Sequence, residues 1–294
     1  IEVMNMLINE VSKITDLTKK AIEYYTLKGL ISPSVLENGY RDYNENDIER
    51  LNKISVLRKL GISTDEIKTV LSDESRSILQ TISVQKELRF QREKAKKSIL
   101  DKLSNGKSYS EVSTEVQAID SSKTITEKLL ETFPGYYGRF ICLHFARFLN
   151  EPIKTNRQQS AYKKKIIFLD NAPSLNLPED LQKYLFEATK HIGTEYITEM
   201  IENTKESIEN FDNFISNNKE MLEQYLAYKQ SNEYKSSPVC KIMELTKEFN
   251  NTSGYNDVFI PALKELSSSY SEYYKQLEIA NKKLLAQYPD IEKM

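Results

Sequence analysis

The 294-residue sequence has little from which to build a disulfide framework or a membrane anchor. It contains two cysteines, Cys142 and Cys240, which are too few for a network of bridges. No apolar run approaches the roughly 18 residues that a membrane-spanning helix needs, and no secretory signal opens the sequence. We therefore expect a cytoplasmic protein with no membrane partner.

The sequence also lacks an excess of basic residues. It carries 41 Lys and Arg against 43 Asp and Glu, a formal net charge of -2. Nonspecific attraction to nucleic acid should therefore be modest, and any DNA binding must come from cations that are placed locally.

Residues that carry enzyme or metal chemistry are few and badly spaced. Cys142 and His144 are two residues apart, so on a helix their side chains point about 200° apart and cannot share one metal ion. His191 and Cys240 have no suitable neighbours, and there is no Gly-rich phosphate loop or Ser-His-Asp pattern. We predict no enzyme activity, no catalytic residue, no cofactor and no metal site.

Residues 7–71 have the pattern of a helix-turn-helix. Apolar residues at three-residue steps mark the buried face of a first helix over 8–14. Thr18 is a good N-cap for a second helix, which Gly29 ends. Because the N-terminal residues of such a second helix meet base edges in the major groove, the two lysines after Thr18 are the best candidates for base or phosphate contacts.

Asn38-Gly39 predicts a hairpin, since both residues tolerate positive φ. The flanking segments 35–36 and 40–43 can form the short strands of a wing, in which Arg41 and Tyr43 can bond phosphate oxygens. Taken singly, the tyrosines of this region can instead be packing residues and the lysines a solvated helix face. Together they predict a DNA-binding surface made of Thr18, Lys19, Lys20, Tyr24, Tyr25, Arg41 and Tyr43.

In order and spacing, these motifs resemble the DNA-binding domain of the MerR family of bacterial transcription regulators. Glu23 stands where many members have Arg, and an acid there would repel phosphate or accept a hydrogen bond from a cytosine amino group. Metal-sensing and iron-sulfur members place clustered cysteines after the dimer helix, and this sequence has none there. The motifs that carry the resemblance are Tyr24-Tyr25, Lys28-Gly29-Leu30, Asn38-Gly39-Tyr40-Arg41 and Arg58-Lys59-Leu60-Gly61-Ile62-Ser63.

The resemblance implies a homodimer on a pseudo-palindromic site in double-stranded promoter DNA. It further implies that effector binding bends and untwists a promoter with overspaced core elements, so that RNA polymerase can engage both of them.

Residues 73–103 contain no Gly or Pro and predict one long helix. Their apolar stripe is thinner than a core helix needs, which favours an antiparallel coiled-coil seam between two protomers. Packing within one chain is the alternative. The stripe consists of Val84, Leu88, Ala95, Ile99 and Leu103.

The remainder predicts a linker over 104–119 and an all-helical domain over 120–294. Residues 166–168 fit either a buried strand or a helical turn, and one long helical pattern over 197–226 has a possible interruption at Asn217-Asn218. The fold is therefore mainly α. The predicted parts are a winged helix-turn-helix domain (1–72), a dimerisation helix (73–103), a linker (104–119) and a helical effector-binding domain (120–294).

Tyrosine is concentrated in the last domain, and helices lined by Tyr and Phe can enclose an apolar or aromatic small molecule. Segment 133–140 is the best candidate for a pocket, because its two glycines allow close backbone approach. Two alternatives remain open: a protein or peptide partner, or a drug-sequestering module whose DNA binding merely autoregulates expression. The predicted ligand-binding residues are Tyr136, Tyr137, Arg139, His144 and Phe148.

Overall fold

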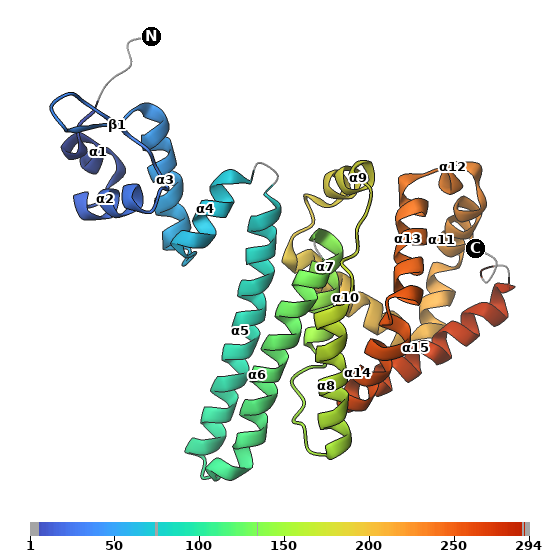
Figure 1. Ribbon diagram of the computed structural model, residues 1–294. Coiled ribbons are helices and arrows are strands. Elements are labelled where there is room, and N and C mark those ends of the chain that lie inside the picture. Colours follow the sequence, from blue (N-terminus) through green and yellow to red (C-terminus); the bar gives the residue numbers. More distant parts are fainter. Residues whose placement is uncertain (1–5, 74–75, 134, 290, 292–294) are drawn as a thin grey trace. The chain divides into compact units, whose positions relative to one another are not determined.

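The computed structural model describes residues 6–73, 76–133, 135–289 and 291. The chain forms two compact units, residues 1–79 and 80–294. Figure 1 shows helices along the chain and a small hairpin near its beginning, which confirms the mainly α prediction. Among the helices described, none is both long and apolar enough to cross a membrane.

The first unit is a helical domain with a two-stranded wing. Local signals fix its helix starts: Thr18 Oγ1 accepts a hydrogen bond from the Ala21 N–H group, and Ser63 and Glu66 form a capping box at the start of α4. Its elements are α1 (Ile8–Thr15), α2 (Lys19–Leu27), β1 (Ser34–Val35), β2 (Arg41–Asp42), α3 (Glu45–Lys59) and α4 (Thr64–Ser72).

The wing is an antiparallel hairpin in which Ser34 pairs with Asp42 and Val35 with Arg41. Gly39 has a φ of +80° in the turn, so the predicted hairpin is confirmed, with glycine at the position that needs it. Met6 extends the pairing, because its backbone exchanges two hydrogen bonds with Tyr43 at 3.1 and 3.0 Å.

One hydrophobic core holds this unit together. The buried residues of α1, α2 and α3 recur at three- and four-residue steps, so one face of each of these helices is buried, and α4 contributes Ile67. The buried apolar residues include Val11, Ile22, Tyr25, Leu30, Ile31, Tyr43, Leu51, Ile54, Leu57, Ile62 and Ile67.

The second unit is built from helices and one π-helical turn. The ambiguous residues 166–168 lie within α8 and are helical, as the all-helical prediction required. The elements are α5 (Ser77–Ser104), which begins in the first unit, α6 (Tyr109–Thr132), α7 (Gly135–Ala146), α8 (Asn156–Asn171), α9 (Glu179–Thr189), α10 (Thr194–Glu209), α11 (Phe211–Gln230), α12 (Asn232–Lys235), α13 (Pro238–Thr252), η1 (Tyr255–Phe259), α14 (Ile260–Leu266) and α15 (Ser268–Gln287).

The predicted linker is wrong over residues 109–119, which are the beginning of α6. Gly106, with a φ of +91°, lies in the turn between α5 and α6. Val112 and Ile119 of α6 then pack with Ile99 of α5. The serines and Glu111 of this segment gave it the composition of a linker, but they lie on the solvated side of a helix, and Glu115 forms an ion pair with Lys102 of α5.

The assignment of the α5 stripe to a second protomer is also corrected by the structure. Ile99 is buried against α6 of the same chain, with Ala95 and Leu103 beside it. Val84 and Leu88 belong to the main core of the second unit. Packing within one chain therefore accounts for the burial of Val84, Leu88 and Ile99.

Two predicted long helices are divided. The pattern over 197–226 is split at Asn210 between α10 and α11, and α11 is kinked at Asn218, near the expected interruption. The sequence also predicts one helix from Pro261 to Gln287, and this helix is broken at Ser267 between α14 and α15.

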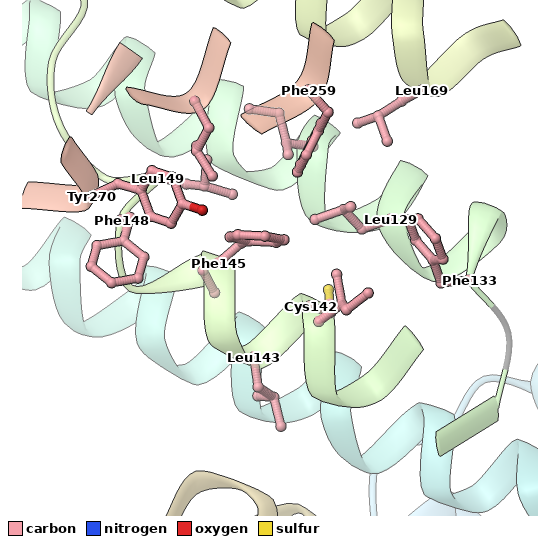
Figure 2. Close-up of a cluster of buried hydrophobic side chains, with 14 of the residues drawn as sticks. Leu129, Phe133, Cys142, Leu143, Phe145, Phe148, Leu149, Leu169, Phe259 and Tyr270 are labelled. Atoms are coloured by element: carbon pink, nitrogen blue, oxygen red, sulfur yellow. The ribbon is translucent and has the colours of Figure 1, made fainter. Parts of the chain in front are cut away.

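Aromatic rings fill the main core of the second unit, and Figure 2 shows them gathered in one cluster. Phe145 of α7 meets the rings of Phe259 and Tyr270 edge-on, with centroids 5.3 and 5.7 Å away. At Gly138 the backbone of α7 approaches the Phe133 carbonyl so closely that a Cβ atom would lie 1.3 Å from its oxygen. This contact is with the chain's own backbone, whereas a Cβ atom at Gly135 would meet nothing within 4 Å.

Candidate nucleic-acid interface and apolar cavity

The first turn of α2 presents a cationic surface. Thr18 caps the helix, and both Lys19 and Lys20 are exposed. Ile22, on the opposite face, is fully buried in the unit's core. The helix therefore holds both ammonium groups at its N-terminal end, where the helix dipole also favours anions.

Tyr24 lies at the surface and Tyr25 does not. Tyr24 is 42% exposed, and its hydroxyl lies 3.5 Å from the Thr64 hydroxyl of α4. Tyr25 follows Ile22 by three residues and is buried with it. Its assignment to the DNA surface is therefore wrong, and the three-residue step was the signal that could have placed it in the core.

The wing carries one half-buried cation and several exposed residues. Arg41 of β2 is half-buried, while Val35 and Tyr40 are exposed. Tyr43 is fully buried, and burial raises the pKa of its hydroxyl. Its predicted phosphate contact is wrong, because the strand turns inward where Tyr43 pairs with Met6 and places the ring in the core.

An apolar cavity of about 580 Å³ lies in the second unit. It contains two of the predicted ligand-binding residues, Tyr136 and Tyr137 of α7. Its other walls were not predictable from the sequence, because they come from segments distant in sequence and have no shared motif. These walls are Leu175 and Leu177 before α9, Leu185 of α9, Ile242, Met243, Thr246, Lys247, Asn250 and Asn251 of α13, and Asn256 of η1.

The other three predicted ligand-binding residues lie elsewhere. Arg139 is buried, and its Nη1 donates a hydrogen bond to the Ile192 carbonyl at 3.1 Å. Phe148 packs on Tyr270 in the main core, with ring centroids 5.2 Å apart. Neither residue lines the cavity, so both predictions are corrected to structural roles.

His144 also belongs to the core. Its ring lies among those of Phe148 and Tyr273, with centroids 5.7 and 5.4 Å away. Burial lowers its pKa to about 4, and the charge of nearby Arg147 acts in the same direction. His144 is therefore a neutral packing residue, and its assignment to the ligand site is wrong.

A wider groove of about 1030 Å³ runs between α5 and α10 and has a different character. Its lining includes Glu87, Glu195, Glu199 and Glu202, against the single cation Lys86. An acidic groove repels phosphate, so it cannot extend a DNA-binding surface.

The described residues contain no group of three or more His, Cys, Asp or Glu arranged to hold a metal ion. Burial raises the pKa of the Cys142 thiol to about 12, and its Sγ donates to the Thr126 carbonyl at 3.2 Å. The thiolate that a metal would need is therefore strongly disfavoured at this position.

Residues 6–74 match a family model described as MerR HTH family regulatory protein. The HTH-type transcriptional regulator HmrR of Sinorhizobium medicae is 42% identical over 76 residues, which make up 24% of this chain and 52% of that protein. The HTH-type transcriptional regulator CueR of Vibrio cholerae is 41% identical over 68 residues, or 23% of this chain and 49% of that protein. Heavy metal-dependent transcription regulator 2 of Rhizobium meliloti is 41% identical over 76 residues, which make up 24% of this chain and 52% of that protein.

The chain therefore spans about half the length of the curated relatives that it matches. The family match covers α1 to α4 and the wing, and it ends at residue 74, before α5 begins.

Proposed function

Because residues 6–74 are a MerR-family helix-turn-helix domain, we propose that this protein is a DNA-binding transcription regulator without enzyme activity. The observation that carries the proposal is the agreement between the family match and the surface of that unit. The first turn of α2 exposes Lys19 and Lys20, and the wing adds Arg41.

On duplex DNA, α2 enters the major groove with its N-terminal end towards the bases. Lys20 contacts a base edge, and Lys19 contacts a base or a neighbouring phosphate. Arg41 bonds a phosphate oxygen and so fixes the register of the domain without reading sequence. Glu23 lies exposed on the same helix, where it accepts from a cytosine amino group and repels misplaced phosphates.

The regulator acts as a homodimer on a pseudo-palindromic promoter site, since two recognition helices related by a two-fold axis read inverted half-sites. Effector binding bends and untwists the promoter so that RNA polymerase engages both core elements. The cost of that deformation depends on the spacer sequence between them.

The second unit senses a small apolar or aromatic molecule. The support for this is the cavity of about 580 Å³, whose volume is in the range of ligand pockets and whose walls include two tyrosines. The heavy-metal dependence in a relative's name does not bear on this unit, because the family match ends at residue 74, before the second unit begins.

The test is selection of bound duplexes from a random pool, followed by anisotropy titrations of the enriched sequence at several salt concentrations. We expect a pseudo-palindromic motif. Arg41→Ala should weaken binding to all duplexes alike and lower the salt slope by about one, whereas Lys20→Ala should change the preferred bases. Lys163→Ala, at an exposed lysine of α8, is the control and should change neither.

Recovery of no enriched motif would reject sequence-specific regulation. The reverse pattern, with Arg41→Ala altering base preference and Lys20→Ala only weakening binding, would reject the assigned residue roles.

A further inference from the structure

We propose that the cavity beneath α13 binds an uncharged or anionic apolar molecule in preference to cations, and that the bound molecule completes the packing of α13. This deepens the proposed function and rests on it for the ligand's regulatory role. Three features of the described residues carry the inference: an underpacked helix, apolar walls, and the charge at the cavity rim.

The helix α13 is amphipathic but incompletely packed. The structure describes all 15 of its residues, and none of them is buried. Its Phe249 anchors one end, with its ring edge-on to Phe133 at 5.5 Å. Nearer the other end, Met243 is 48% exposed and accepts a hydrogen bond at its Sδ from the Tyr234 hydroxyl. An apolar helical face over an open cavity leaves dispersion contacts unmade, and a ligand can supply them.

The residues of α13 that line the cavity form one stripe along the helix. They recur at one- and four-residue steps, so they share a face. Opposite this stripe, Leu175, Leu177 and Leu185 provide aliphatic walls that are only half-buried. These walls predict a ligand whose surface is mostly apolar. The stripe consists of Ile242, Met243, Thr246, Lys247, Asn250 and Asn251.

Charge at the rim decides the sign of the ligand. Lys247 is the one charged side chain among the described lining residues, and no carboxylate lines the cavity there. A cation would therefore meet a like charge without a counter-ion, whereas an anionic end group would meet an ammonium group.

The uncharged polar groups of the cavity wall favour a ligand that carries a hydrogen-bond donor. The Asn250 side chain hydrogen-bonds the Tyr137 hydroxyl, while its Oδ1 is buried and accepts no hydrogen bond from the described atoms. It can accept from a ligand N–H or O–H group, which would relieve the cost of its desolvation. The Tyr136 ring already has the Arg139 guanidinium 5.8 Å from its centroid, so one of its two faces holds a cation.

The test uses two matched fluorophores on the full chain: N-phenyl-1-naphthylamine, which is uncharged, and 8-anilino-1-naphthalenesulfonate, its anionic relative. Tetraphenylphosphonium is the cationic competitor. We expect both fluorophores to bind saturably at one site per chain and tetraphenylphosphonium not to displace them. Met243→Trp should fill the cavity and lower both affinities by at least about tenfold. Met221→Trp, at a 59% exposed methionine of α11, is the control and should leave them unchanged.

Charge is tested with Lys247→Glu. It should weaken binding of the sulfonate by about threefold or more and leave the uncharged probe nearly unchanged. Lys241→Glu, at an exposed lysine of the same helix that does not line the cavity, should alter neither affinity. Hydrogen exchange with the uncharged probe bound should slow across 238–252, because the ligand completes the packing of α13.

Displacement by tetraphenylphosphonium, or equal losses from Met221→Trp and Met243→Trp, would overturn the proposal. Unchanged exchange in α13 at saturating probe would overturn its packing role. DNA affinity for the selected duplex is measured on the same preparation. Retained DNA binding without probe binding rejects this inference alone, and probe binding without DNA binding rejects the proposed function.

Discussion

Replacing Lys165 by methionine should stabilise the second unit. Lys165 lies on α8 and is fully buried, on the same helical face as Ala161, Phe168 and Leu169. Its Nζ has no hydrogen-bond partner among the described atoms, and burial lowers its pKa well below the usual value. The folded protein therefore bears an unsatisfied amine, which the unfolded chain exposes to water as an ammonium ion.

Methionine keeps the length of the side chain and removes the amine. From the desolvation of one unpaired polar group and the cost of holding the amine uncharged, we expect Lys165→Met to raise the free energy of unfolding by about 2–4 kcal/mol near neutral pH. The gain should fall as pH rises. Between the lowered folded pKa and the unfolded pKa, the unfolded chain binds a proton that the folded chain does not, so the wild type becomes more stable by up to about 1.4 kcal/mol per pH unit.

The assay is urea unfolding followed by circular dichroism, at about pH 7 and about pH 9.5, with the transition of the second unit analysed separately. Lys163→Met, at an exposed position of the same helix, is the matched control and should change stability by less than about 0.5 kcal/mol. A Lys165→Met variant no more stable than the wild type at neutral pH would refute the reasoning. So would a difference between the two proteins that does not shrink as pH rises.

Two further predictions concern the same unit. Gly138→Ala should destabilise it by about 3 kcal/mol or more in thermal unfolding, because the new Cβ would overlap the Phe133 carbonyl. Gly193→Ala is the control, because a Cβ atom there meets nothing within 4 Å. Equal losses of stability in the two variants would contradict the steric reason. Thiol titration of the folded protein near pH 8 should detect Cys240 and not Cys142, whose pKa burial raises to about 12, and denaturation should release the second thiol. Rapid modification of both thiols in the folded state would show that Cys142 is accessible.

Local signals account for most of the first unit. Thr18 and Ser63 cap helices through their own side chains, and Gly39 adopts the positive φ that the wing's turn requires. Each of these acts within a few residues, so the sequence alone was sufficient to find it. The prediction that Tyr25 and Tyr43 contact DNA is wrong, because both side chains are buried. Their residue type alone suggested a place at the surface.

In the second unit, the sequence determined that helices form and which faces are apolar. It could not determine what covers those faces. The stripe of α5 demands a partner surface, and α6 of the same chain supplies that surface at Ile99, although the same periodicity fits a second protomer equally well. The cavity likewise joins α7 to segments more than thirty residues away in sequence, and the burial of Lys165 contradicts what its residue type predicts. Periodicity specifies that an apolar surface must be buried, and only the tertiary structure decides which residues bury it.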